Sequence, residues 1–257
     1  MKLLRLLPLL PLLLMLAACT GISSQAAPTA TPFPTVPPVP TPPDIPSRPV
    51  SFTTSDHLNL VGQLYGQGKT WVICSHMNGT TMSIWSDSGI PQRLAAMGYQ
   101  VLLYDFRGFG SSAGDVDTTT LDVDLTASVN YAQKQGATKV VLLGASMGGT
   151  ASLNVAANDP NKALIAAVIS LSGPQDFGVD VTDAQLKVMT IPKLFLASVD
   201  DDTFGSDAQH MYDIASPPKE IHLYEGQNHG TTILNSNDGD DPALRILHFI
   251  QKYAPAS

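Results

Sequence analysis

An apolar run at residues 139–143 passes directly into a stretch of small residues at 144–152, in which Ser146 lies between Gly144 and Gly148. The run predicts a buried strand, and the small residues that follow are compatible with a helix. Where a strand turns at once into a helix, the turn residue is strained, so its neighbours must be small and its side chain projects above the sheet edge. The pattern G-x-S-x-G therefore indicates a nucleophilic Ser146, although a turn that only packs a helix onto a strand has the same letters.

A nucleophilic serine also needs a base, an acid and donors for the oxyanion. The apolar run 191–199 ends in three aspartates at 200–202, and His229 follows the strand-like run 220–224. The candidate nucleophile, acid and base thus occur in the chain order Ser, Asp, His.

Two more segments carry a resemblance to a known family. Residues 98–112 contain an apolar strand followed by Asp105-Phe106-Arg107-Gly108-Phe109-Gly110-Ser111-Ser112, and residues 71–79 end in His76-Met77-Asn78-Gly79. Together with the order Ser, Asp, His, these motifs make residues 50–255 resemble the α/β-hydrolase superfamily of serine hydrolases.

The resemblance implies roles for individual residues. Ser146 would be the nucleophile, His229 the base and Asp201 the residue that orients the imidazole. The family pattern P-x-L-x-x-x-G-x-x-D selects Asp201 over its two acidic neighbours, with Ser198 in place of the glycine. The other aspartates are expected to be solvated and to cap a helix that begins near Ser206.

Oxyanion donors are also implied by position. The first is the amide of Met147, at the start of a helix. The second is the amide of Asn78 or, alternatively, of Met77, which stands where the family most often has glycine. His76 and Arg107 are expected to brace their loops, with a second-base role for His76 as the weaker alternative.

The alternation of strand-like and helical runs predicts an α/β fold with a mostly parallel central sheet of about eight strands flanked by helices. Only one short helix, at 182–189, is expected between 172 and 191, where many relatives insert a lid. A minimal lid favours small, soluble or polymer-end esters over triglycerides, although the loop 79–85 is another possible lid. The expected strands are 51–54, 58–64, 71–75, 101–104, 140–143, 166–172, 193–198 and 220–224, and the other expected helices are 84–97, 119–134, 147–158, 207–215 and 242–253, with Asp159-Pro160 ending the third of these.

The N-terminal region predicts export. Residues 1–18 have a short basic start and an apolar stretch too short for an ordinary membrane span, and they end before Cys19 as in the signal peptide of a bacterial lipoprotein. An ordinary signal cleaved after small residues is the alternative. Residues 19–49 contain the lipid-anchor Cys19 and a tether rich in Pro and Thr, and residues 50–257 form the catalytic domain.

Composition limits the partners. A net charge of −8 makes nucleic acid an improbable partner, and no cofactor is expected. Cys74 is expected to be an inert core residue. The run 237–241 suggests a solvated helix start rather than a calcium site, because it lacks the regular loop spacing. The histidines show no metal-ligand spacing, and a monomer is expected.

These observations predict a carboxylesterase-like serine hydrolase that works through an acyl-enzyme and is lipid-anchored on the extracytoplasmic face of a bacterial membrane. Its partners would be a small-molecule ester or acyl substrate and, through the anchor, the membrane. A peptidase, thioesterase, lipase or acyltransferase would use the same three residues. A membrane-anchored binding module without turnover is the alternative from another class.

Overall fold

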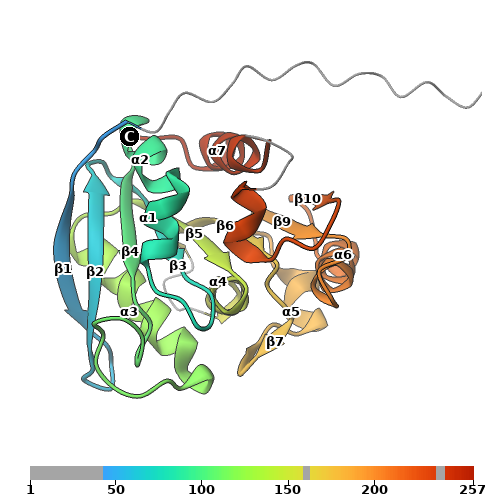
Figure 1. Ribbon diagram of the computed structural model, residues 1–257, viewed down its shortest axis with the longest axis horizontal. Coiled ribbons are helices and arrows are strands. Elements are labelled where there is room, and N and C mark those ends of the chain that lie inside the picture. Colours follow the sequence, from blue (N-terminus) through green and yellow to red (C-terminus); the bar gives the residue numbers. More distant parts are fainter. Residues whose placement is uncertain (1–42, 159–162, 236–240) are drawn as a thin grey trace, which may run out of the picture. The chain divides into compact units, whose positions relative to one another are not determined.

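A computed structural model describes residues 43–158, 163–235 and 241–257, and an eight-stranded sheet lies at its centre (Figure 1). The strands run across the sheet in the order β1-β2-β4-β3-β5-β6-β9-β10. Their bounds are β1 Ser47–Thr53, β2 Asn59–Gly66, β3 Thr70–Ser75, β4 Gln100–Tyr104, β5 Lys139–Ala145, β6 Ile165–Leu171, β9 Lys193–Ser198 and β10 Lys219–Tyr224.

The sheet is antiparallel at one end and parallel elsewhere. β2 pairs antiparallel with β1 and β4, whereas β4, β3, β5, β6, β9 and β10 are joined by parallel pairs. The six parallel strands therefore end at one edge of the sheet, which we call the carboxyl edge, and start at the opposite amino edge. The predicted α/β fold is confirmed.

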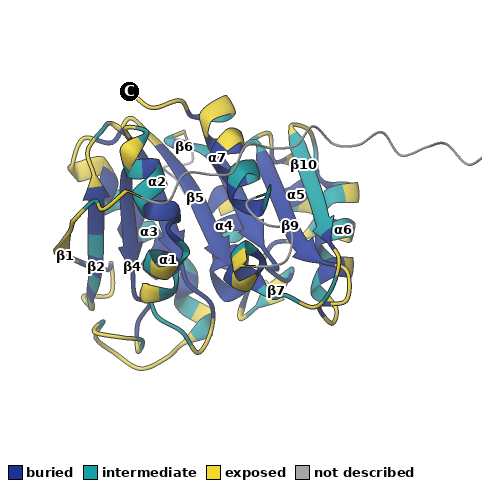
Figure 2. Ribbon diagram, turned by 45° about the horizontal axis from the view of Figure 1, so that its top comes forward, coloured by how far each residue is buried: buried dark blue, intermediate teal, exposed yellow. Residues whose placement is uncertain are grey.

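Helices cover both faces of the sheet. One apolar cluster includes side chains of α3, α4, α5 and α6, and the other includes side chains of α1, α2 and α7. Figure 2 shows the inner strands buried along their length, while the outermost strands, β1 and β10, are only partly covered. The helix bounds are α1 Ser83–Ser88, α2 Ile90–Ala96, α3 Leu121–Lys134, α4 Met147–Asn158, α5 Asp183–Val188, α6 Phe204–Ile214 and α7 Asp241–Tyr253, with 3-10 turns η1 Thr118–Thr120 and η2 Gly230–Asn235.

Two helix predictions were wrong in detail. The single helix expected at 84–97 is broken at Gly89, whose φ of +71° is left-handed and ends α1 before α2 begins. The helix expected from 207 begins at Phe204, one turn earlier. Its N-cap, Thr203, makes no side-chain cap bond, and Ser206 Oγ donates to Thr203 O instead. The acidic cap predicted near Ser206 is therefore not formed.

The chain between β6 and β9 is short, as expected. It holds α5, capped by the Thr182 side chain, and a small hairpin of β7 (Asp176–Phe177) and β8 (Val179–Asp180) that the sequence did not predict. At the other end of the chain, β1 starts at Ser47 and so extends into the segment predicted to be a tether.

Several expectations fall outside the described residues. These are the signal peptide at 1–18, Cys19, most of the tether, the Asp159-Pro160 helix end, and the acidic run apart from Asp241, which is the first residue of α7. Among the helices that are described, none has the length and apolar character needed to cross a membrane.

Candidate active site

Ser146 occupies a sharp turn between β5 and α4. Its φ is +50°, a left-handed value that is strained for a residue with a side chain. A Cβ added to Gly144 would lie 2.0 Å from Gly148 O, and one added to Gly148 would lie 2.3 Å from Ser75 O. Only glycine fits at either position, as the predicted need for small neighbours requires.

The backbone of Ser146 is fully engaged, but its hydroxyl is not. Ser146 N donates to Leu171 O at 2.7 Å, and Ser146 O accepts from the amides of Gly149 and Thr150 in the first turn of α4. Ser146 is only 6% exposed. Within the described parts of the chain, its Oγ has no hydrogen-bond partner, so the hydroxyl of a largely buried residue is held at the carboxyl edge with its bonding capacity unused.

Asp201 and His229 form a hydrogen-bonded pair at the same edge. Asp201 follows β9 and His229 follows β10, and His229 Nδ1 lies 2.8 Å from Asp201 Oδ2. Because a carboxylate only accepts, Nδ1 donates, and in the neutral tautomer Nε2 is left as an acceptor. The His229 side chain is 31% exposed and that of Asp201 is 8% exposed. Of the three consecutive aspartates, Asp201 is the buried one that reaches the imidazole, whereas Asp200 and Asp202 are exposed.

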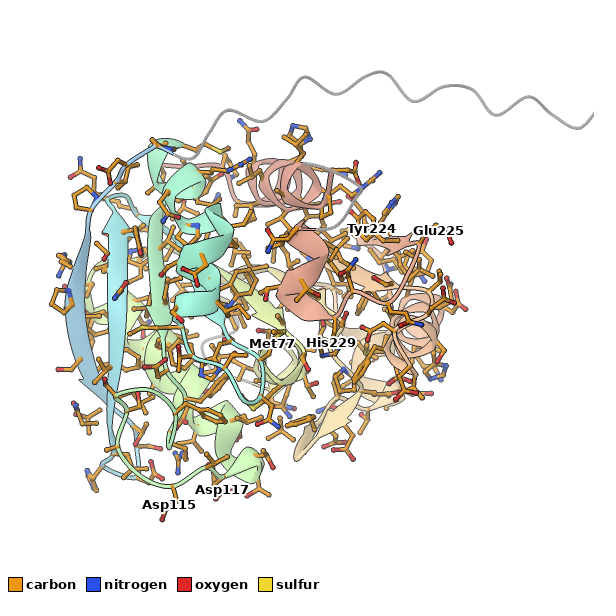
Figure 3. The ribbon with its side chains drawn as sticks, in the orientation of Figure 1. Met77, Asp115, Asp117, Tyr224, Glu225 and His229 are labelled. Carbon is orange, nitrogen blue, oxygen red and sulfur yellow. The ribbon has the colours of Figure 1, made fainter. Side chains whose placement is uncertain are left out.

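The loop of His229 lies against the strand end that carries Ser146. A Cβ on Gly230 would be 2.3 Å from Met77 Sδ and 3.4 Å from Ala145 Cβ, so Gly230 lies close to the residue that precedes Ser146. Figure 3 shows Met77 and His229 as neighbours in the centre of the view. No hydrogen bond joins the Ser146 and His229 side chains in the described residues.

The loop after β3 has a fixed backbone. Met77 O accepts from His76 Nδ1 at 2.8 Å, from Thr80 Oγ1 at 2.8 Å and from Thr80 N at 3.3 Å. In a trans peptide the next N–H points opposite to this carbonyl, so the Asn78 amide is directed away from these three donors. Met147 is the first residue of α4, where an N–H has no acceptor within the helix.

His76 and Arg107 act as braces, as expected. His76 is buried, its Nε2 accepts from Phe106 N at 3.0 Å, and burial lowers the pKa of the imidazole. With both ring nitrogens bonded to the backbone, His76 has no site left for a second base. Arg107 forms hydrogen bonds to Asp124 and Asp56, which join its loop to α3 and to the β1–β2 turn.

Sequence reasoning missed two contributions. The Asp105 carboxylate accepts from Met82 N at 2.7 Å and Ser111 N at 3.1 Å, so it ties together the loops after β3 and β4. The Phe204 ring lies 4.3 Å from the imidazole of His229, centroid to centroid. The D-x-R-G motif was a signal for Asp105, whereas Phe204 meets His229 only through the tertiary fold.

Cys74 is completely buried, and burial raises the pKa of its thiol, as expected for an inert core cysteine. Across residues 43–158, 163–235 and 241–257, no group of three or more His, Cys, Asp or Glu side chains is arranged to hold a metal ion.

Comparison with solved structures gives the same fold. An esterase of Pyrococcus furiosus, Pf2001, superposes with a TM-score of 0.70 at 20% identity, over 86% of this chain and 98% of the esterase. The α/β-hydrolase GrgF of a Penicillium species gives 0.67 at 19% identity, over 81% and 99%. A dienelactone hydrolase of Anabaena variabilis gives 0.66 at 19% identity, over 81% and 98%.

The family model for the alpha/beta hydrolase fold matches residues 70–215, which is more than half of the chain. This match includes β3 to α6, and therefore the turn of Ser146 and the loop of Asp201. The protein belongs to the α/β-hydrolase fold family.

Proposed function

We propose that this hydrolase-fold protein cleaves carboxylic esters through an acyl-enzyme on Ser146, with His229 as the base and Asp201 orienting the imidazole. The observation that carries the proposal is the unpartnered hydroxyl of a strained, largely buried Ser146 at the same sheet edge as the hydrogen-bonded Asp201–His229 pair. A protein that only binds has no physical need for this combination.

The chemistry follows from these groups. Ser146 Oγ attacks the carbonyl carbon while His229 Nε2 takes its proton, and the proton then passes to the alcohol that leaves as the C–O bond breaks. Water attacks the acyl-enzyme in the same way and releases the acid. Asp201 holds Nδ1–H and stabilises the imidazolium. The amides of Met147 and of Asn78, or alternatively Met77, stabilise the oxyanion.

The short connection between β6 and β9 favours short acyl groups. A two-residue-per-strand hairpin and the six-residue α5 offer little apolar surface to cover a long chain. A butyryl ester is therefore a suitable first substrate.

Ser146→Ala is the decisive test of the reaction. We expect kcat/KM for p-nitrophenyl butyrate to fall by about 10⁴-fold, because the nucleophile is lost. A fluorophosphonate probe should label the natural protein and not the variant, while the circular dichroism spectra of the two proteins should agree. Labelling of the variant, or turnover near that of the natural protein, would reject Ser146 as the nucleophile. Absence of turnover and of labelling in both would favour the binding-module alternative.

The same proposal places the enzyme on a membrane through Cys19, on the support of residues 1–18 and the Pro/Thr-rich segment that follows. We expect Cys19→Ser to move the protein from the membrane pellet to the soluble fraction when it is expressed in a bacterium. Retention of the variant in the pellet would rule out a lipid on this cysteine.

A further inference from the structure

The loops at the carboxyl edge carry an excess of negative charge. Seven carboxylates, which we call the acidic rim, lie exposed on the loops after β4, β6, β9 and β10. They are Asp115, Asp117, Asp176, Asp180, Asp200, Asp202 and Glu225.

Three members of the rim lie on the loops that carry Asp201 and His229, and the other four lie on further loops of the same edge. Asp200 and Asp202 flank Asp201, and Glu225 lies on the loop that leads to His229. Asp200 N donates to Gly226 O at 3.0 Å, so these two loops are in contact. Figure 3 shows Asp115 and Asp117 below Met77 and His229, and Glu225 to their upper right.

The other acidic loops also touch each other. A Cβ on Gly178, between β7 and β8, would lie 2.5 Å from Thr118 O, so the β7–β8 hairpin that bears Asp176 and Asp180 lies against the segment of Asp117. Hydrogen bonds from Thr119 lower the pKa of Asp117, which keeps this carboxyl ionised.

Cations do not balance the rim. In the described residues none of the seven carboxylates forms an ion pair. The loops 76–82, 105–118, 172–182, 199–203 and 225–235 contain one Lys or Arg, which is Arg107. Arg107 is buried and bonded to Asp56 and Asp124, so its charge is already compensated.

Lysines gather instead at the opposite edge. Lys139, Lys193 and Lys219 are the first residues of β5, β9 and β10, and Lys69 immediately precedes β3. The loops at the carboxyl edge, where the unpartnered Ser146 hydroxyl lies, thus carry an excess of negative charge, and these four lysines lie at the other end of the strands. A cleft edge of one sign raises the local concentration of oppositely charged substrates and repels those of like charge.

We propose that the acidic rim makes this site selective for esters that carry a positive charge, such as a quaternary ammonium or amine group, and selective against anionic esters. The inference rests on the proposed ester hydrolysis and names its substrate class. It identifies a charge preference rather than a further catalytic residue.

Three butyryl esters test the proposal. Butyrylcholine is cationic, 3,3-dimethylbutyl butyrate is its neutral isostere, and 4-butyryloxybutanoate is anionic. All three form the same acyl-enzyme, so differences in kcat/KM report the alcohol side. We expect the cationic ester to exceed the anionic one by about tenfold or more in 20 mM NaCl, and the ratio to shrink to about threefold or less in 500 mM NaCl as salt screens the rim.

Matched variants separate the rim from net charge. Asp115→Asn, Asp200→Asn and Glu225→Gln together should lower the cation-to-anion ratio of kcat/KM at low salt by about fivefold. The control makes the same charge change away from the carboxyl edge, with Asp44→Asn, Asp213→Asn and Glu220→Gln, and should leave the ratio within about twofold.

The outcomes are distinguishable. Hydrolysis of the neutral ester with no ranking by charge, or equal loss of ranking in the rim and control variants, would overturn the charge inference and leave ester hydrolysis standing. Failure to hydrolyse any of the three esters would overturn both.

Discussion

At the carboxyl edge, the largely buried Ser146 is held in a left-handed conformation, and its hydroxyl has no hydrogen-bond partner in the described residues, whereas at the amino edge the buried ammonium of Lys193 donates to Met189 O at 2.8 Å and Ser216 O at 2.7 Å. Ser172, where β6 ends, repeats the first situation. Its φ is +48°, and its buried Oγ has no partner in the described residues. Ser146 and Ser172 thus combine a strained backbone with unused hydroxyls, whereas the Lys193 ammonium has two hydrogen-bond acceptors.

This contrast indicates that the features that suit the carboxyl edge for a reaction also lower the stability of the fold there. An unpaired buried hydroxyl and a left-handed non-glycine residue each destabilise a fold, so they persist where the surrounding packing imposes them. Here that packing is the close approach of Gly148 to Ser75 O. Substitutions at the carboxyl edge should thus change activity more than stability, and substitutions at the amino edge should do the reverse.

Of the substitutions that test this contrast, Asp201→Asn at the carboxyl edge is expected to have the largest effect, and that effect is on activity. The amide side chain keeps the shape but offers no carboxylate to Nδ1–H, so the imidazole is held in the wrong tautomer and its cation is no longer stabilised. We expect kcat for p-nitrophenyl butyrate to fall by about 10³- to 10⁴-fold, with the free energy of unfolding in urea changed by about 1 kcal/mol or less. Asp202→Asn is the matched control, because that neighbouring side chain is exposed and forms no hydrogen bond or ion pair with His229. Similar losses in both variants would break the assignment of Asp201.

A smaller effect, on stability alone, is expected from Lys193. Burial and the nearby Lys219 lower the pKa of Lys193 from its usual 10.5 to about 8. Between these values the folded protein has released a proton that the unfolded chain still binds, so this group makes stability rise with pH. Between pH 7 and 10 its contribution to the free energy of unfolding should grow by about 2 kcal/mol.

Lys193→Met isolates that contribution, because the tyrosines and other groups titrate in both proteins. The free energy of unfolding of the natural protein minus that of the variant, measured in urea, should increase from pH 7 to pH 10. Activity per folded molecule should be equal in the two proteins at pH 7.5. If the difference in the free energy of unfolding does not change with pH, the lowered pKa of Lys193 is contradicted. A loss of activity in the variant would contradict the expectation that substitutions at the amino edge affect stability alone.

Much of the fold was predictable from local patterns. The strands predicted at 193–198 and 220–224, and the helix at 147–158, agree with the structure to within a residue. These segments combine continuous apolar runs with clear breaks. The helix predicted at 84–97 was wrong because of a single residue, Gly89, in the middle of the segment. Gly89 takes a left-handed φ, which the pattern of apolar and polar residues does not reveal.

The candidate site was predictable where a motif spans few residues. Ser146 and its glycines are constrained by one turn, and Asp201 by its spacing from Pro192. The hydrogen bond from His229 to Asp201 agrees with the pairing that the family resemblance implied. The contact of Gly230 with Met77, and that of Phe204 with His229, join segments far apart in the chain, and no local pattern encodes them.

The sequence by itself determined the class of fold, the strained serine and the residue types of the candidate site, because apolar periodicity and glycine spacing act over a few neighbouring residues. Only the tertiary structure decided which side chains meet and where charge accumulates. The net charge of −8 does not say at which edge of the sheet the negative side chains lie. The parallel strands bring the ends of six separate segments to one edge, and this topology gathers the acidic side chains of four loops at the edge of the candidate site, while Lys69, Lys139, Lys193 and Lys219 lie at the other end of the strands.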